Sequence, residues 1–158
     1  MEVSEGSCRL GLWYVNVTWE DTVVHRIRFQ RTGIPGPVPD PITRYLAGRT
    51  TTLEPMISLL PERPDTYGHI YQAVLAIPYG SVRTYGEVAK QAGTNPRTVG
   101  LAMSRNSTPL IIPCHRVVAS NGLGGFTPDV WIKKELLRIE ADVVKKLMKH
   151  DRNFQEFP

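Results

Sequence analysis

The segment TYGEVAKQAGTNPRTVGLAMSRN, residues 84–106, predicts two short helices joined by a tight turn. The first helix spans residues 85–92, and the turn spans residues 93–95. Pro96 suits the first position of the second helix, which extends to about Arg105, because that position needs no backbone N–H. This is the layout of a helix-turn-helix. Short helical hairpins also occur in proteins that never bind DNA, so this segment alone leaves the function open.

The N-terminal part is predicted to be rich in β-structure. Apolar and polar residues alternate through residues 12–30, which indicates a β-hairpin. In this register His25 lies on the apolar face as a structural histidine, while Arg26 and Arg28 lie on the solvent face. A proline-rich loop follows, and then a short helix is expected at residues 42–47.

Composition and charge both change at residues 61–65, which predicts a boundary between a domain of residues 1–62 and a domain of residues 63–158. The second domain is expected to be helical. Apolar residues at helical spacing predict one helix around residues 70–77. Thr127 followed by proline predicts the N-cap of the last helix, and the final ten residues are expected to be loosely held.

The charge of the chain is concentrated in its second part. The 158 residues carry a formal net charge of +4, and residues 67–158 contain twelve basic and seven acidic residues. Such a basic segment suits a polyanionic partner. No apolar run is long enough to span a membrane, and the N-terminus lacks the features of a signal peptide, so a cytoplasmic location is expected. The two cysteines lack the spacing of zinc ligands, and no metal or other cofactor is expected.

A thiol and an imidazole are adjacent in the sequence Pro113-Cys114-His115-Arg116, which follows an apolar run. Apolar neighbours raise the pKa of a thiol, so a nucleophilic cysteine here needs a base, and His115 is the nearest one. A carboxylate usually orients such a histidine, and Glu87 and Glu140 are candidates. These residues alone fit a cysteine hydrolase as well as an alkyl acceptor. They also fit a buried cysteine with no chemical role.

More than fifty residues of the chain resemble the catalytic domain of the methylated-DNA–protein-cysteine methyltransferases in order and spacing. The resemblance implies an α+β fold. Its first part is a ribonuclease H-like β-sheet domain with a helix, and its second part is an all-α, winged-helix-like helix-turn-helix catalytic domain. The segments that carry the resemblance are Thr84–Ala89, Asn95–Gly100, Arg105-Asn106, Ile112–Val118, Gly122, Gly124–Phe126 and Lys133–Glu140.

The resemblance implies a role for each residue of the catalytic group. Cys114 would accept the alkyl group, and His115 would help to deprotonate it through a water molecule. Glu140 would orient His115, Tyr85 would donate a proton to the departing guanine, and Asn106 would order the loop that carries the cysteine. This chemistry requires the damaged nucleotide to leave the base stack, because a buried O6-alkyl carbon is otherwise out of reach.

The resemblance also implies how DNA is bound. Arg97 would take the place of the extruded base, and small residues on the second helix would allow close docking in the minor groove. The expected DNA-binding residues are Arg97, Thr98, Gly100, Thr84 and Ala102, and the expected pocket residues are Val117, Ala119, Ser120, Phe126 and Thr127. Phe126 stands where many family members have tyrosine, and Thr98 replaces a commonly smaller residue. Arg116 is expected to pair with a carboxylate at the domain interface.

The predicted function is therefore the direct reversal of O6-alkylguanine in double-stranded DNA by a monomer. The product at Cys114 would be a thioether, which has no carbonyl for water to attack, so each molecule would react once and inactivate itself. The main alternative is a non-enzymatic alkyltransferase-like protein that binds the lesion without reacting. The presence of Cys114 argues against that alternative.

Overall fold

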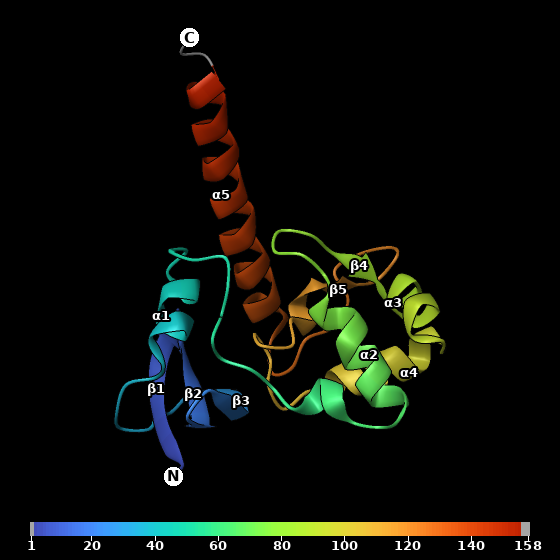
Figure 1. Cartoon of the computed structure of the whole chain (residues 1–158), viewed down its shortest axis with the longest axis horizontal. Helices are drawn as coiled ribbons and strands as arrows, with labels where there is room; N and C mark the ends of the chain where they lie inside the picture. The colour runs from blue at the N-terminus through green and yellow to red at the C-terminus, as the bar shows by residue number, and fades with distance from the viewer. Residues whose placement is uncertain (1, 156–158) are drawn as a thin grey trace.

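The computed structural model describes residues 2–155 and places an antiparallel sheet and a set of helices on opposite sides of a long C-terminal helix (Figure 1). None of the helices within residues 2–155 is both long and apolar enough to cross a membrane. The elements in chain order are β1 (Ser4–Leu10), β2 (Trp13–Glu20), β3 (Val23–Gln30), α1 (Asp40–Leu46), a 3₁₀ turn (Leu60–Glu62), α2 (Thr66–Leu75), β4 (Arg83–Thr84), α3 (Tyr85–Ala92), α4 (Pro96–Ser104), a second 3₁₀ turn (Cys114–Arg116), β5 (Val117–Val118) and α5 (Val130–Gln155).

The N-terminal sheet has the strand order β1-β2-β3, and all of its pairs are antiparallel. The predicted hairpin is confirmed as β2 and β3, and β1 adds a strand that the sequence pattern did not indicate. The predicted position of His25 is wrong. The register shifts so that Thr18 faces Arg26 and Trp19 faces Val24, which leaves His25 as the extra residue of a bulge. Val24 therefore lies in the core, and His25 lies outside, 3.5 Å from Glu20.

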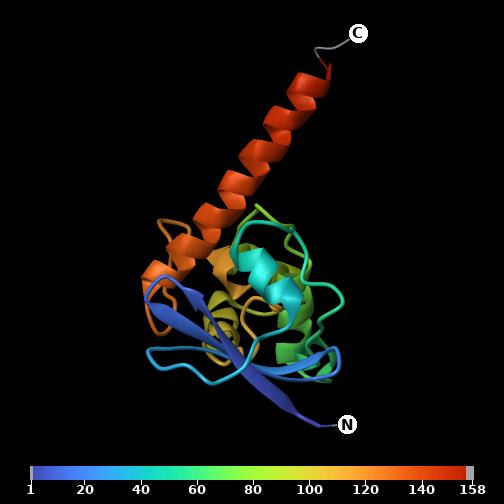
Figure 2. The same cartoon turned by 90° about the vertical axis from the view of Figure 1, so that its left-hand side faces the viewer.

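Two hydrophobic clusters hold the molecule together, and the segment before Cys114 contributes to both. The first cluster joins the sheet and α1 to α5 through Ile132, Leu136 and Ile139, and it includes Leu110 and Ile111. The second cluster joins α2, α3 and α4, and it includes Ile112 and Val117. Figure 2 shows the sheet and α1 in front of the helices α2, α3 and α4, with α5 extending above them. Residues on both sides of Cys114 are thus anchored in packed cores, which restricts how the thiol can move.

The helices α3 and α4 have strong local start and stop signals. Thr84 caps α3 in a capping box with Glu87, and Gly93 ends that helix with a φ of 74°. Asn95 then caps α4, its side chain accepting from Thr98 N at 2.9 Å, and Pro96 occupies the first turn. The helix-turn-helix layout predicted from residues 84–106 is therefore present. Glu87 is occupied as a capping residue, which removes it as a candidate for orienting His115.

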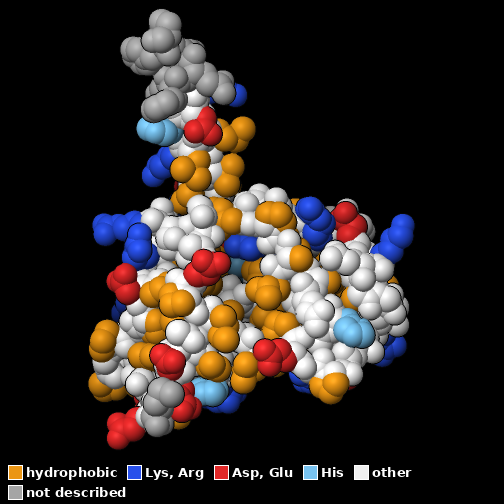
Figure 3. Space-filling view, in the orientation of Figure 1, with side chains coloured by type: hydrophobic (Ala, Val, Ile, Leu, Met, Phe, Trp, Pro, Cys, Tyr) orange, Lys and Arg blue, Asp and Glu red, His pale blue; other side chains and the backbone are white. Residues whose placement is uncertain are grey.

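The helix α5 starts later and continues further than the sequence indicated. It begins at Val130, not next to Thr127, and Asp129 Oδ1 accepts a hydrogen bond from Trp131 N at 2.9 Å near its start. It extends to Gln155, so the described part of the tail is helical where loose structure was expected. Its outer half projects from the body with Leu147 and Met148 exposed (Figure 3). The predicted domain boundary after residue 62 stays a prediction.

Candidate active site

Cys114 lies at the start of a short 3₁₀ turn and lines a pocket of about 470 Å³. Its backbone N–H donates to Ile112 O at 2.7 Å. Only 8% of the residue is exposed. Residues of β3, of α4 and of the loop before α5 form the walls of this pocket. The thiol is thus accessible only to a group that enters the pocket.

Asn106 ties together the loop that precedes Cys114. Its Nδ2 donates to Ile112 O at 2.9 Å, and its Oδ1 accepts from Thr108 N at 3.0 Å. Burial raises the pKa of the Cys114 thiol, and hydrogen bonding to Asn106 and the charge of Lys133 offset part of that rise. The thiol is therefore protonated at neutral pH and needs a base before it can act as a nucleophile.

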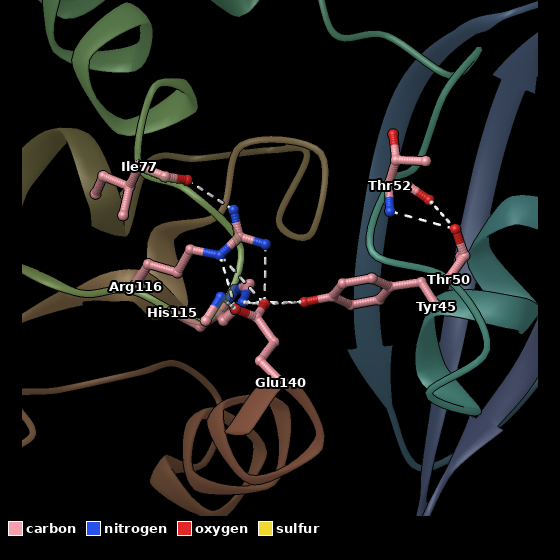
Figure 4. A network of polar contacts seen from close by, with 8 residues as sticks. Tyr45, Thr50, Thr52, Ile77, His115, Arg116 and Glu140 are labelled. Carbon is pink, nitrogen blue, oxygen red and sulfur yellow. Dashed lines mark hydrogen bonds and ion pairs between the residues drawn. The ribbon is translucent and has the colours of Figure 1, made fainter. Parts of the chain in front are cut away.

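Glu140 is the centre of a buried polar network (Figure 4). Its Oε2 lies 2.6 Å from His115 Nε2 and 3.0 Å from Arg116 Nη2, and it also accepts from the Tyr45 hydroxyl. Its Oε1 accepts from Gly80 N at 2.8 Å and from Arg116 Nε at 3.0 Å. Burial alone would raise the pKa of this carboxyl, but the hydrogen bonds from His115 and Arg116 outweigh it and lower the pKa to about 2. Glu140 is therefore ionised, with Arg116 as its cation.

The hydrogen bonds of His115 identify its base nitrogen. Because Nε2 faces the Glu140 carboxylate, that nitrogen carries the proton of the neutral ring, and Nδ1 has the free lone pair. Nδ1 is buried and has no hydrogen-bond partner among the described residues. Burial lowers the pKa of His115, although the hydrogen bond to Glu140 opposes this effect. The ring is thus a neutral base with one nitrogen held by a carboxylate and the other able to accept a proton.

The structure brings six of the predicted site residues to the pocket of Cys114. Tyr85, Gly100, Asn106, Cys114, Phe126 and Thr127 all line it. Val117, Ala119 and Ser120 do not line this pocket, although they were expected to. Val117 is fully buried in the helical core, and its carbonyl accepts from Lys133 Nζ at 2.6 Å. Because its side chain is in the core and its carbonyl is bound by Lys133, Val117 is not placed for the role that the resemblance implied.

The predicted DNA-contact residues are divided between the surface and the core. Arg97 is exposed near the start of α4, and a side chain at Gly100 would meet no protein atom within 4 Å. Thr84 and Thr98 are engaged in helix capping, Thr98 Oγ1 donating to Asn95 Oδ1 at 3.1 Å. The prediction for Ala102 is wrong, because it is fully buried and its carbonyl accepts from the Tyr71 hydroxyl at 2.9 Å. A methyl group in the core cannot face a ligand outside.

Several site residues were not found from the sequence. Lys133 is buried, and its Nζ donates to Val117 O and Gly125 O, which joins α5 to the pocket loop. Arg26 and Arg28 are exposed residues of β3, and they are the only charged residues among those that line the pocket in the described part of the chain. The alternation in β3 placed these arginines on the solvent face, but no local signal indicates that this face and α4 line the same pocket.

Known proteins are similar to this chain both in sequence and in structure. Residues 65–142 match the family model described as 6-O-methylguanine DNA methyltransferase, DNA binding domain. The chain belongs to this methyltransferase family. It is 39% identical over 107 residues to the methylated-DNA–protein-cysteine methyltransferase of Metallosphaera sedula, and the match covers 66% of each chain. It is 49% identical over 100 residues to that of Saccharolobus solfataricus, covering 61% of this chain and 63% of the relative. The matches therefore span slightly less than two thirds of these curated relatives.

Solved structures of this family have a similar fold. A Mycobacterium tuberculosis OGT in complex with DNA has a TM-score of 0.72 at 27% identity, and the match covers 87% of this chain and 92% of that one. The O6-methylguanine-DNA methyltransferase of the hyperthermophilic archaeon Pyrococcus kodakaraensis has a TM-score of 0.66 at 27% identity, covering 88% of this chain and 99% of that one. The mixed α/β fold with its small N-terminal antiparallel sheet is therefore the fold of this methyltransferase family.

Proposed function

We propose that this protein repairs O6-alkylguanine in double-stranded DNA by transferring the alkyl group to Cys114, once per molecule. The observation that carries this proposal is the arrangement around the thiol. Cys114 lines a pocket and is followed by a neutral His115, whose Nδ1 is unpaired among the described residues and whose Nε2 is held by an ionised carboxylate. The curated relatives are named methylated-DNA–protein-cysteine methyltransferases, which supports the same kind of activity. The proposed protein is thus a self-inactivating methylated-DNA–[protein]-cysteine S-methyltransferase.

The reaction begins with the thiol proton, which passes to His115 Nδ1 directly or through a water molecule. Glu140 stabilises the imidazolium that forms, because its carboxylate already accepts from Nε2. The Cys114 thiolate then attacks the alkyl carbon, the bond between that carbon and O6 breaks, and its electron pair leaves with the guanine. Tyr85, which lines the pocket, supplies the proton that makes guanine a better leaving group. The product is a thioether on Cys114 and an unmodified guanine.

The damaged nucleotide enters the pocket after it is flipped out of the duplex, through the minor groove. Exposed Arg97 fills the place that the base leaves, and Gly100 permits close approach of the DNA to α4 because no side chain projects there. Contacts with the DNA backbone make binding largely independent of base sequence and sensitive to salt.

We further propose that the N-terminal part is ribonuclease H-like, that the helical part is winged-helix-like, and that the protein acts as a cytoplasmic monomer.

Mass spectrometry of the intact protein tests the reaction. Incubation with a duplex that contains one O6-methylguanine is expected to add one methyl group to each protein molecule, at Cys114. The Cys114→Ala variant is the matched control and is expected to bind the duplex without a mass gain. Binding without a mass gain in the native protein would support the lesion-binding alternative. Repeated turnover of the duplex, or no affinity for it, would contradict both functions.

Arg26 and Arg28 provide a second test, because they add positive charge to the pocket in a protein whose proposed substrate is a polyanion. We expect both side chains to contact phosphates next to the flipped nucleotide. The double variant Arg26→Gln, Arg28→Gln should bind the duplex more weakly, and its slope of log affinity against log salt should be shallower by roughly 0.9 for each phosphate that is no longer neutralised. Arg44→Gln, at an exposed position on α1 outside this pocket, is the control. Equal slopes for the three proteins would exclude phosphate binding by β3.

A further inference from the structure

The catalytic network contains a residue from the N-terminal part of the chain, outside the segment that matches the family model. Tyr45 lies on α1, while the match covers residues 65–142. Its side chain is almost fully buried, with 1% of the residue exposed. Its hydroxyl donates to Glu140 Oε2 and lies 3.1 Å from His115 Nε2 (Figure 4). A hydroxyl from α1 therefore shares one carboxylate oxygen with the proposed catalytic base.

We propose that Tyr45 is a positioning residue for the alkyl transfer, holding Glu140 in place and limiting how strongly that carboxylate attracts the His115 proton. This inference rests on the proposed function. Three side chains donate to the same oxygen, Glu140 Oε2: Tyr45, His115 and Arg116. Each donor withdraws negative charge from it, so each weakens the hydrogen bonds that the others make. Tyr45 thereby reduces the basicity of His115 while fixing the orientation of its ring.

The Tyr45 hydroxyl stays protonated at neutral pH and can therefore act as a hydrogen-bond donor. Burial, together with the negative charge of Glu140, raises the pKa of Tyr45 well above its usual value, so the hydroxyl keeps its proton. The other charged or titratable groups around the His115–Glu140 pair are Arg116 on the same turn, Lys133 on α5, the neighbouring Cys114 thiol and Tyr79 in the loop after α2. Among these, Arg116 also donates to Glu140, whereas the Tyr79 hydroxyl has no hydrogen-bond partner among the described residues.

Tyr45 lies outside the pocket of Cys114, so its substitution is expected to change the rate of alkyl transfer and not the affinity for DNA. Tyr45 and Arg116 line a second pocket together with residues 110–113, and neither lines the pocket of Cys114. The polar contacts of Tyr45 connect it to the thiol through Glu140 and His115. A change at Tyr45 should alter the rate constant of the transfer and its pH dependence, and it should leave the affinity for the duplex unchanged.

Single-turnover kinetics with saturating O6-methylguanine duplex test this role in the full chain. In Tyr45→Phe the Glu140 carboxylate loses one donor, so His115 becomes more basic. The acidic limb of the rate profile is then expected to move to higher pH by roughly half a unit to one unit. The rate on the plateau is expected to fall by roughly tenfold, because the ring is held less firmly. Duplex affinity should stay at the native value.

Tyr79→Phe is the matched control. Its ring packs edge-on against Tyr45 at 6.0 Å between centroids, and its hydroxyl makes no hydrogen bond within the described residues, so the profile should match the native one. A variant with 3-fluorotyrosine at position 45 keeps the fold and makes the phenol a stronger donor, and it should move the limb to lower pH. An NMR titration of the His115 ring follows the same shifts without relying on activity.

The outcomes distinguish this inference from the function on which it rests. If Tyr45→Phe loses stability but keeps the native pH profile and the native His115 titration, Tyr45 is only a structural residue and the inference is wrong. If the native protein itself gains no methyl group from the duplex, the proposed function fails instead. A shift of the acidic limb in opposite directions for phenylalanine and fluorotyrosine would support the positioning role.

Discussion

Replacing His115 with glutamine is expected to lower the rate constant of alkyl transfer by about 10²- to 10⁴-fold, the usual contribution of a positioned base. Burial raises the pKa of the Cys114 thiol, so almost none of it ionises at neutral pH without a base. Glutamine can still hydrogen-bond to Glu140, but it cannot accept the thiol proton. The rate constant is measured by mixing excess protein with O6-methylguanine duplex and following the loss of the lesion.

Two further measurements make this result specific to proton transfer. Duplex affinity should be unchanged in His115→Gln, because His115 does not line the pocket. The native rate constant should stay on its plateau below the usual imidazole pKa of about 6.5, since burial lowers the pKa of His115 and keeps it a neutral base. A variant that reacted at the native rate would show that Cys114 is activated by another group.

Replacing Glu140 with glutamine is expected to lower the free energy of unfolding by about 3–5 kcal/mol, because it leaves Arg116 as a buried cation without its carboxylate. Only 1% of the Glu140 side chain and 10% of the Arg116 side chain are exposed, so water cannot replace the lost partner. Urea unfolding at neutral pH measures this difference. The same variant should also lose alkyl-transfer activity, because His115 would lack its negatively charged partner.

Glu135→Gln is the control on the same helix. Glu135 pairs with Arg138 on the exposed side of α5, where 58% of the arginine side chain is accessible. Losing an exposed pair of this kind costs about 0–1 kcal/mol. Equal destabilisation by the two substitutions would mean that the buried network does not stabilise the fold beyond an ordinary surface ion pair.

The same carboxylate determines part of the acid sensitivity of the protein. The pKa of Glu140 is about 2 in the folded protein, below the ordinary value of 4.5 for a glutamate side chain. A depressed carboxyl pKa adds stability that is fully present above pH 4.5 and is lost as the pH falls through about 2. Unfolding measured over this range should therefore show a steeper loss of stability in the native protein than in Glu140→Gln. Parallel curves would contradict the assignment of Glu140 as a buried ionised group.

Local sequence signals were sufficient for the helix-turn-helix and insufficient for the sheet. The bounds of α3 agree with the prediction because Thr84, Glu87 and Gly93 form its caps within the helix and the adjacent residues. In β3, the alternating pattern placed residues 26–29 on the correct faces but placed His25 on the wrong one, because the bulge at His25 depends on how β3 pairs with β2. The start of α5 was misplaced for a similar reason. The threonine–proline pair at 127 belongs to the pocket loop, and Asp129 interacts with the first turn of α5.

The sequence by itself determined the two helices α3 and α4 and predicted the chemistry proposed for the site beside them. Cys114, His115 and Glu140 were recognised because thiol, base and carboxylate occur in an order and spacing that resembles a known family, and capping acts over only a few residues. Only the tertiary structure decided that Tyr45 would share Glu140, a residue 95 positions later, and that Arg26 and Arg28 would line the pocket of Cys114. These contacts form because two separate hydrophobic clusters pack on either side of the catalytic segment and bring the N-terminal sheet and α1 against it. No local period in the sequence records that packing.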